Sequence, residues 1–315
     1  MNDNNSKRIT ILTPVYNEEE CLTIYKERVK DILLSHKEYC FNILLIDDGS
    51  TDKSWEHICD ICSDNPMFNG IRLSRNYGSH IALSAGFSNI NDSDAVATLA
   101  CDLQDPPETI IEFINKWEQG AQIVWGHRKK RSDNKWRILT SKLFFYLIRR
   151  FAMPIDSKFA TGSFFLIDKK VANCFVQFQE TNRITFALVA WTGFKQDIVE
   201  YDRQQRIGGT SGWNFNKMIK TMYDTFLGFS FLPIRLITII GMILFFLTFL
   251  FAGYIFINWL SGNPLKGWTS LMLVMTTISG IHFLLMGITG EYLYRIYSEV
   301  VRRPLYFISD KIGKI

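Results

Sequence analysis

Residues 8–19 read RITILTPVYNEE, an apolar run followed by a polar stretch. The same order returns at residues 42–52, NILLIDDGSTD. Short apolar runs bounded by turn-forming residues are typical of buried strands, and the stretches between them show helical spacing. This alternation of strands and helices predicts an α/β fold with a parallel sheet.

Further apolar runs at residues 70–74, 95–101 and 122–126 extend the pattern. Polar segments follow two of them, RNYG at residues 75–78 and DLQDPPE at residues 102–108. Taken singly, each polar segment is equally well explained as a turn or a helix cap. Ligands of open α/β sheets gather beyond the carboxyl ends of the strands, so the ordered set of four segments predicts one crevice.

The 315 residues suggest one large domain plus a smaller part, with 47% hydrophobic and 21% charged residues. Residues 1–210 carry 26 basic and 27 acidic residues, whereas residues 211–315 carry nine basic and four acidic ones. Positive charge concentrated beside apolar runs indicates anionic lipid rather than nucleic acid. The six cysteines lack regular spacing, so we expect reduced thiols and interpret the Cys59–Cys62 CxxC as structural.

Two uncharged apolar runs occupy residues 236–257 and 269–290, the second interrupted only by His282. A helix of about 20 residues covers the roughly 30 Å hydrocarbon core of a bilayer, which favours membrane spans over core helices. Basic residues flank the pair on both outer sides, while the connecting loop holds only Lys266. The pattern predicts a multi-pass inner or plasma membrane protein with its N-terminal domain in the cytoplasm. The polar N-terminus predicts no cleaved signal peptide.

The expected domains are a cytosolic α/β domain at 1–210, a juxtamembrane amphipathic segment at 211–235, the hairpin at 236–290 and a basic cytosolic tail at 291–315. Residues 135–151, KWRILTSKLFFYLIRRF, match a basic amphipathic helix at a membrane surface, and residues 213–231 are a second candidate. Packing in the protein core is the alternative for both segments.

The motifs PVYNEE, DDGSTD, RNYG and DLQDPPE, in this order, resemble the nucleotide-sugar domain of family 2 glycosyltransferases, which have the Rossmann-like GT-A fold. With the two-helix hairpin, the whole chain is similar to the branch of bactoprenol glucosyltransferases and dolichol-phosphate mannose synthases. The resemblance implies inverting transfer of a sugar, with UDP-glucose or UDP-N-acetylglucosamine as expected donors, to undecaprenyl or another polyprenyl phosphate for cell-envelope glycans. The implied partners are the donor, the lipid acceptor and the bilayer.

A sugar that leaves with a nucleotide diphosphate builds negative charge, which a divalent metal stabilises. Mg²⁺ or Mn²⁺ prefers oxygen ligands, so Asp102 can supply a carboxylate, with Gln104 as a neutral neighbour. By resemblance, Asp102 is the second acid of the family's DXD element. Ala100 stands where the family has the first acid.

The resemblance also implies substrate contacts. Asp48 corresponds to a base or ribose contact, and the segment 201–213 to one that closes over the donor and acceptor phosphates. Ser163 replaces an acid proposed to act near the acceptor, and Phe165 replaces an arginine. The candidate catalytic residues are Asp102, Arg128 and Ser163, and the candidate substrate-binding residues are Pro14, Tyr16, Glu18, Asp48, Arg75, Arg137, Arg203 and Arg206.

An acceptor phosphate monoester with a second pKa of about 6 is largely dianionic at neutral pH and needs little general base. It does need charge compensation, and residues 116–150 hold ten basic against two acidic residues. Arg128 and Arg137 resemble phosphate-binding positions, because the planar guanidinium can bind two oxygens.

Two alternatives stay open. A catalytically silent, nucleotide-sugar-binding membrane scaffold is motivated by Ala100, Ser163 and Phe165. A processive polysaccharide synthase is opposed by the lack of a Gln-x-x-Arg-Trp sequence and by the presence of only two predicted spans. The sequence specifies neither the sugar nor whether the chain forms a homo-oligomer.

Overall fold

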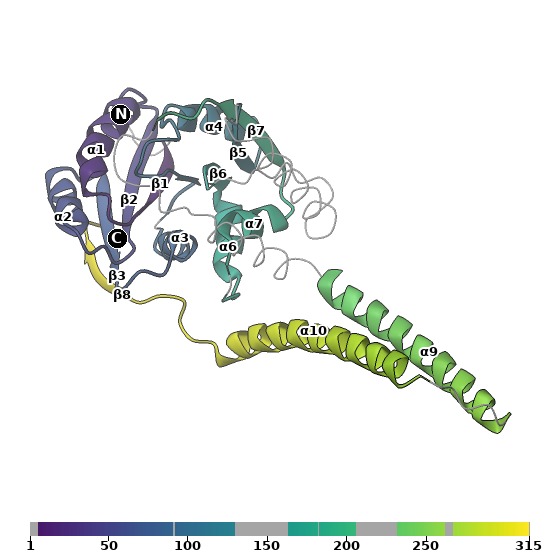
Figure 1. Cartoon of the computed structure of the whole chain (residues 1–315). Helices are drawn as coiled ribbons and strands as arrows, with labels where there is room; N and C mark the ends of the chain where they lie inside the picture. The colour runs from purple at the N-terminus through teal and green to yellow at the C-terminus, as the bar shows by residue number, and fades with distance from the viewer. Residues whose placement is uncertain are drawn as a thin grey trace. The chain divides into compact units, whose positions relative to one another are not determined.

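The computed structural model describes residues 6–90, 92–129, 163–181, 183–205, 232–261 and 267–314. The chain divides into two compact units: Met1–Thr225 together with Pro304–Ile315, and Phe226–Arg303 (Figure 1). The predicted interface segments at 135–151 and 213–231 lie outside the described residues.

The first unit is an α/β structure, as the alternating pattern predicted. Its strands are β1 (Lys7–Val15), β2 (Tyr39–Asp47), β3 (Phe68–Leu73), β4 (Ala95–Thr98), β5 (Ile123–Arg128), β6 (Phe165–Asp168), β7 (Gln196–Tyr201) and β8 (Ile308–Ile312). Its helices are α1 (Glu19–Leu34), α2 (Ser54–Asp64), α3 (Ser79–Ser88), α4 (Thr109–Glu118), α6 (Lys169–Gln177) and α7 (Thr185–Trp191).

These strands form one sheet in the order β7-β5-β6-β4-β1-β2-β3-β8. Strand β1 pairs in parallel with β2 and β4, β2 pairs in parallel with β3, and β5 pairs in parallel with β7. The sheet is not wholly parallel, because β6 runs antiparallel to β4 and β5, and β8 runs antiparallel to β3. Six strands therefore end at the same edge: β1 to β5 and β7.

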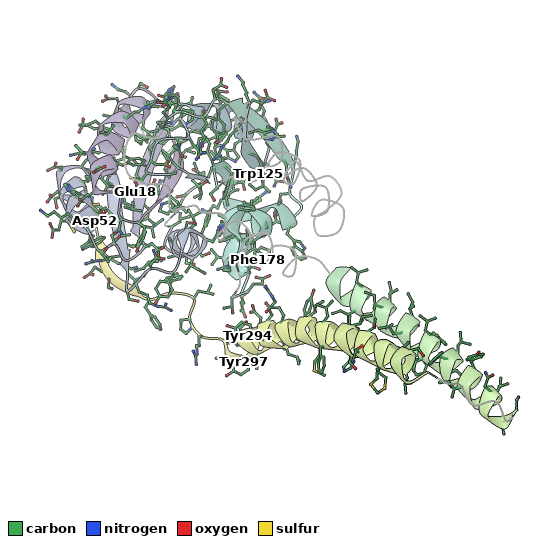
Figure 2. All side chains as sticks on the ribbon, viewed as in Figure 1. Glu18, Asp52, Trp125, Phe178, Tyr294 and Tyr297 are labelled. Atoms are coloured by element: carbon green, nitrogen blue, oxygen red, sulfur yellow. The ribbon has the colours of Figure 1, made fainter. Side chains whose placement is uncertain are left out.

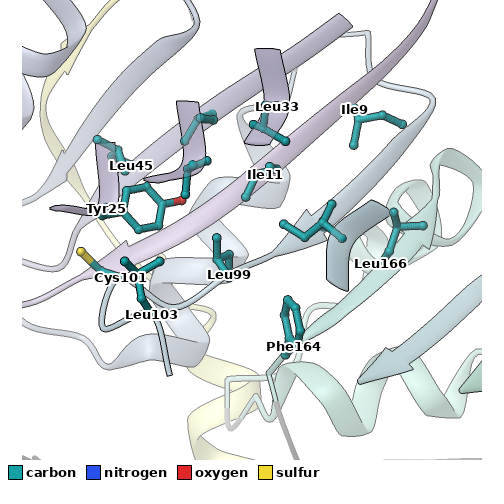
Figure 3. Packing of buried hydrophobic residues seen from close by; sticks show 14 of the residues in the cluster. Ile9, Ile11, Tyr25, Leu33, Leu45, Leu99, Cys101, Leu103, Phe164 and Leu166 are labelled. Atoms are coloured by element: carbon teal, nitrogen blue, oxygen red, sulfur yellow. The ribbon is translucent and has the colours of Figure 1, made fainter. Parts of the chain in front are cut away.

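Helices cover both faces of the sheet, which explains why the strands are nearly continuous apolar runs. On one face, Ile9 and Ile11 of β1 join a core with Tyr25 of α1 (Figure 3). Phe113 of α4 belongs to the same core. On the other face α3 lies against β1 and β2, where a Cβ on Gly86 would come within 2.8 Å of Ile46.

The C-terminal strand β8 is a feature that the sequence analysis did not expect. Residues 291–315 were assigned to a tail, but Ile308–Ile312 pair with β3 at the edge of the sheet. The Ser74 N–H donates to the Phe307 carbonyl at 2.9 Å, and the Lys314 N–H donates to Asn69 Oδ1 at 2.6 Å. The end of the chain therefore supports the start of the segment that follows β3.

The second unit contains α9 (Leu232–Leu260) and α10 (Trp268–Val301), which contact each other. Both helices are long and apolar enough to cross a membrane, and their apolar windows, Leu236–Ile255 and Ser270–Val301, are not buried in the described structure. Helix α10 continues past the predicted end at residue 290, with an ion pair of 3.0 Å between Arg295 and Glu291. It ends at Val301, and the C-cap residue Arg302 has a left-handed conformation (φ 49°), two residues before Pro304.

Candidate active site

The strand order of the sheet reverses beside β1. The chain runs from β1 to β2 and β3 on one side and then returns to β4 on the other side of β1. In open α/β sheets, ligands bind where the strand order reverses in this way. The segments after β1 and β4 therefore border the expected crevice.

The segments after β1 and β2 are joined by hydrogen bonds. The Asn17 N–H donates to Ser50 Oγ at 3.0 Å, and the Thr51 N–H donates to Asn17 Oδ1 at 2.9 Å. The Glu18 N–H donates to Ser54 Oγ at 3.0 Å. Figure 2 shows Glu18 and Asp52 near each other at adjoining helix starts. These bonds fix the loop that carries Tyr16 and Glu18, just after Pro14 near the end of β1; Pro14 is half-buried and Tyr16 is exposed.

Asp48 connects the segment after β2 with the segment after β3. Its two carboxylate oxygens accept the backbone N–H groups of Tyr77 and Gly78, each at 2.8 Å. Burial raises the pKa of Asp48 to about 6, against the lowering effect of these two N–H groups. Asp48, the predicted contact to the nucleobase or ribose, thus also shapes the loop that carries Arg75. The Arg75 guanidinium lies 4.4 Å from the Tyr77 ring centre.

In the segment after β4, buried and half-buried residues alternate. Leu99, Cys101 and Leu103 are at most 2% exposed, and Figure 3 shows them among the core residues. Asp102 lies between Cys101 and Leu103, Gln104 lies between Leu103 and the buried Asp105, and both are only half-buried. Leu103 has a φ of 51°, unusual for a bulky residue, and such strain clusters at functional sites. Packing of the odd-numbered residues therefore directs Asp102 and Gln104 away from the core.

Gln104 is the centre of a contact between this segment and the one after β7. Its N–H donates to Asp102 Oδ1 at 3.2 Å, and its carbonyl accepts the Gln204 N–H at 2.9 Å. Its side-chain oxygen accepts a hydrogen bond from Arg203 Nη2. The structure thus brings together Asp102, Gln104 and Arg203, three predicted site residues that lie far apart in the sequence.

The contacts of Asp102 and Gln104 indicate which of the two could be a ligand of a divalent metal ion. Within the described ranges no group of three or more His, Cys, Asp or Glu side chains could hold an ion. Asp102 fits as a single protein ligand, with the other oxygens supplied by a diphosphate and water. Gln104 fits poorly, because the guanidinium of Arg203 occupies its side-chain oxygen.

Arg128 belongs to a buried network that the sequence did not reveal. The Tyr201 hydroxyl donates to Asp105 Oδ1 at 2.5 Å, and Arg128 Nε donates to the Tyr201 oxygen at 3.1 Å. Arg128 Nη2 lies 3.6 Å from Asp105 Oδ1. Burial raises the pKa of Asp105, while the Arg128 guanidinium opposes that rise. Asp105 and Tyr201 therefore fix the orientation of the predicted phosphate-binding arginine.

Ser163 lies beside the end of β4. Its carbonyl accepts a hydrogen bond from Thr98 Oγ1, which also accepts the Phe165 N–H at 3.2 Å. Continuing the β4–β6 register from Ala97 and Leu166 makes Ser163 the partner of Ala100. Two of the three positions that depart from the family pattern, Ala100 and Ser163, are thus neighbours in this extended register. Arg137 and Arg206 lie outside the described residues.

Two solved structures resemble the fold at low sequence identity. One is mannosyl-3-phosphoglycerate synthase from Rubrobacter xylanophilus, with a TM-score of 0.48 and 14% identity over 69% of this chain and 71% of that chain. The other is glucosyl-3-phosphoglycerate synthase from Mycobacterium tuberculosis in complex with Mn²⁺, uridine diphosphate and glucosyl-3-phosphoglycerate, with a TM-score of 0.45 and 12% identity over 69% and 76%. Both are too distant to support conclusions about ligands.

Curated proteins match along nearly the whole chain. The sequence is 36% identical to a glycosyltransferase, sll0501, of Synechocystis over 97% of this chain and 96% of that protein. It is 33% identical to the SfII prophage-derived bactoprenol glucosyl transferase of Shigella flexneri over 96% and 97%. The family model described as glycosyl transferase family 2 matches residues 10–176, which include the segments after β1 to β5. The chain therefore belongs to glycosyl transferase family 2, and its fold is the GT-A type that the motifs predicted.

Proposed function

We propose that the protein is a membrane-bound, inverting glycosyltransferase that moves a sugar from a nucleotide diphosphate to a polyprenyl phosphate. The supporting observation is the similarity to bactoprenol glucosyl transferase along 96% of this chain, which includes both the site segments and the two apolar helices. UDP-glucose and UDP-N-acetylglucosamine are the first donors to test.

The reaction is a direct displacement. A phosphate oxygen of the acceptor forms a bond to the anomeric carbon, the bond from that carbon to the nucleotide diphosphate breaks, and the nucleotide diphosphate leaves. The acceptor phosphate is already largely dianionic at neutral pH. A general base is therefore dispensable, which agrees with a serine at position 163.

The protein's own task is to bind and orient two anions. The segments after β1, β2 and β3 form the nucleotide side, because they are joined through Asn17, Ser50 and Asp48. Arg128 and Arg203 lie at the ends of β5 and β7 and form the acceptor side. Asp105 and Tyr201 hold the Arg128 guanidinium in place, which limits the entropy lost when it binds phosphate.

Asp102 is the residue that would hold Mg²⁺ or Mn²⁺ between the two sides. When bound, the cation would neutralise charge that develops on the departing diphosphate. In this proposal Gln104 is not a metal ligand: it positions Arg203 and, through its N–H, orients the Asp102 carboxylate.

We further propose that α9 and α10 cross the inner or plasma membrane and that the catalytic unit is cytoplasmic. Large apolar side chains, among them Phe245, Phe249 and Leu284, are at least 65% exposed on these helices. Such surfaces need an apolar surrounding. Basic residues at the outer ends of the pair favour the cytoplasmic side for both flanks.

The test uses the full-length protein in lipid nanodiscs with radiolabelled UDP-sugars, undecaprenyl phosphate and Mg²⁺ or Mn²⁺. We expect label in the lipid fraction, and its loss on adding a chelator or on Asp102→Asn. Asp64→Asn is the matched control, because Asp64 is an exposed aspartate paired with Lys26 on the surface. Donor binding without transfer, across a broad donor panel, would instead identify the silent scaffold that Ala100 and Ser163 motivate.

A further inference from the structure

Arg28 of α1 connects two segments that border the site. Its Nη1 donates to Gln204 Oε1 at 2.7 Å, and its Nη2 donates to Glu108 Oε1 at 2.9 Å. In the sequence, Glu108 lies 80 positions and Gln204 lies 176 positions from Arg28. One planar guanidinium thus bridges the segment after β4 and the segment after β7.

The part of α1 that carries Arg28 is packed firmly in the core. Arg28 follows Tyr25 by one helical turn and precedes Val29, and both neighbours are 0% exposed in the core. The helix therefore fixes where the Arg28 side chain begins, while 29% of that side chain remains exposed. The two terminal nitrogens of the planar Arg28 guanidinium can then define the position of Gln204 relative to Glu108.

The bridge closes a ring of contacts around Gln104. Gln204 is held from one side by Arg28 and from the other by the Gln104 carbonyl, which accepts its N–H. Arg203, the preceding residue, donates to the Gln104 side chain. Fixing Gln204 thus keeps the Arg203 guanidinium beside Gln104 and Asp102.

We propose that Arg28 is a positioning residue for the acceptor: by holding Gln204, it keeps Arg203 where the phosphate monoester of the acceptor binds. This inference rests on the proposed function. The acceptor side is favoured because β7 lies beyond β4 in the strand order, on the side opposite to β1, β2 and β3. The nucleotide segments follow those three strands and are joined to one another by hydrogen bonds.

The ion pair between Arg28 and Glu108 is exposed to solvent, so a role of Arg28 in positioning Gln204 can be distinguished from a role in folding. Glu108 is 52% exposed at its side chain, and solvent-exposed ion pairs contribute little to stability. The Asp105–Tyr201–Arg128 network is buried and supports the fold nearby. Loss of Arg28 should therefore release residues 202–205 without unfolding the unit.

The experiment compares wild type, Arg28→Ala, Arg28→Lys and Lys26→Ala. Lys26 is the matched control, because it lies on the same helix and pairs at 2.9 Å with Asp64, away from the site. Three quantities are measured on the full-length protein: hydrogen exchange of the backbone at 202–205, the Kd for geranyl phosphate as a short acceptor, and the Kd for UDP.

For Arg28→Ala we expect faster exchange at 202–205 and a geranyl phosphate Kd raised about three- to tenfold, the size of change that the loss of a typical hydrogen bond produces. The UDP Kd should stay within about twofold, and Lys26→Ala should match wild type. Arg28→Lys should recover only part of the loss, because one ammonium group does not reproduce a two-ended planar fork.

Exchange and geranyl phosphate affinity equal to those of Lys26→Ala would overturn the proposal. So would faster exchange with unchanged geranyl phosphate affinity, or an equal loss of UDP affinity. The proposed function fails separately, if wild type transfers no label to undecaprenyl phosphate from any donor while these variants still differ in phosphate binding.

Discussion

Replacing Gly49 by alanine adds one methyl group where the segment after β2 lies against the backbone of the segment after β3. A Cβ at this position would lie 2.4 Å from the Arg75 carbonyl carbon, 2.7 Å from Arg75 Cα and 2.8 Å from the Asn76 nitrogen. All three are backbone atoms, so no side chain can turn aside to make room. The φ of Gly49 is also +69°, a conformation that alanine adopts at a cost.

The two effects can be estimated separately. A left-handed conformation costs alanine about 1–2 kcal/mol. Forcing an extra methyl group into a packed region costs about 1–3 kcal/mol more, because the backbone at residues 75 and 76 must shift. The variant should therefore lose about 2–5 kcal/mol of unfolding free energy. The shift also displaces Tyr77 and Gly78 from Asp48, so donor binding should weaken.

Gly193→Ala is the control for backbone conformation. Gly193 has a φ of +74°, and nothing lies within 4 Å of the position of an added Cβ. Thermal unfolding of both variants, with UDP affinity measured by calorimetry, separates the effects. Gly193→Ala should cost only about 1–2 kcal/mol and leave UDP binding unchanged. Equal destabilisation in the two variants, with normal UDP affinity in Gly49→Ala, would refute the close packing of these loops.

Three other changes test the polar groups of the site. Because burial raises the pKa of Asp48 to about 6, above its unfolded value, the stability contributed by its protonated form is lost as the pH rises through about 6. Asp48→Asn should therefore gain up to about 3 kcal/mol relative to wild type between pH 4 and 7, as measured by thermal unfolding; a constant difference would contradict the pKa. Tyr201→Phe removes the hydroxyl between Asp105 and Arg128 and should cost about 1–3 kcal/mol in urea unfolding and weaken binding of geranyl phosphate, whereas an unchanged midpoint would show that the network is dispensable. Thr98→Val keeps the side-chain shape but removes the hydrogen bonds to Ser163 and Phe165; we expect a loss of about 1–3 kcal/mol and lower transfer activity, and wild-type values for both would mean that Thr98 does not position Ser163.

The nucleotide half of the fold could be predicted because its signals are local. Strands β1 to β5 are apolar runs, and each of the first four is followed by a polar segment. Strand β8 was missed, because ISDKI at 308–312 is short, half polar and far from its partner β3 in the sequence. The end of α10 was also missed, because charge marks the end of a membrane span but not of the helix that contains it.

The sequence could identify individual site residues, but it could not show which of them contact one another. The sequence identified Asp102, Gln104 and Arg203 individually, but only the fold places Arg203 on the side-chain oxygen of Gln104. Asp105 was recognised only as part of a motif, since nothing local shows that Tyr201, 96 residues later, donates to it. Arg28 gave no signal, because an arginine on an amphipathic helix is typical of any solvated face.

Strand β8 also determines how a water-soluble form of the catalytic unit could be made. The unit is discontinuous in sequence, since Pro304–Ile315 belong to it although they follow both apolar helices. A shortened protein that ends before α9 would leave β3 as an open edge, and bare edges recruit other chains into aggregates. Replacing residues 226–303 by a glycine–serine linker, and keeping the last twelve residues, would preserve the sheet while removing the two long apolar helices.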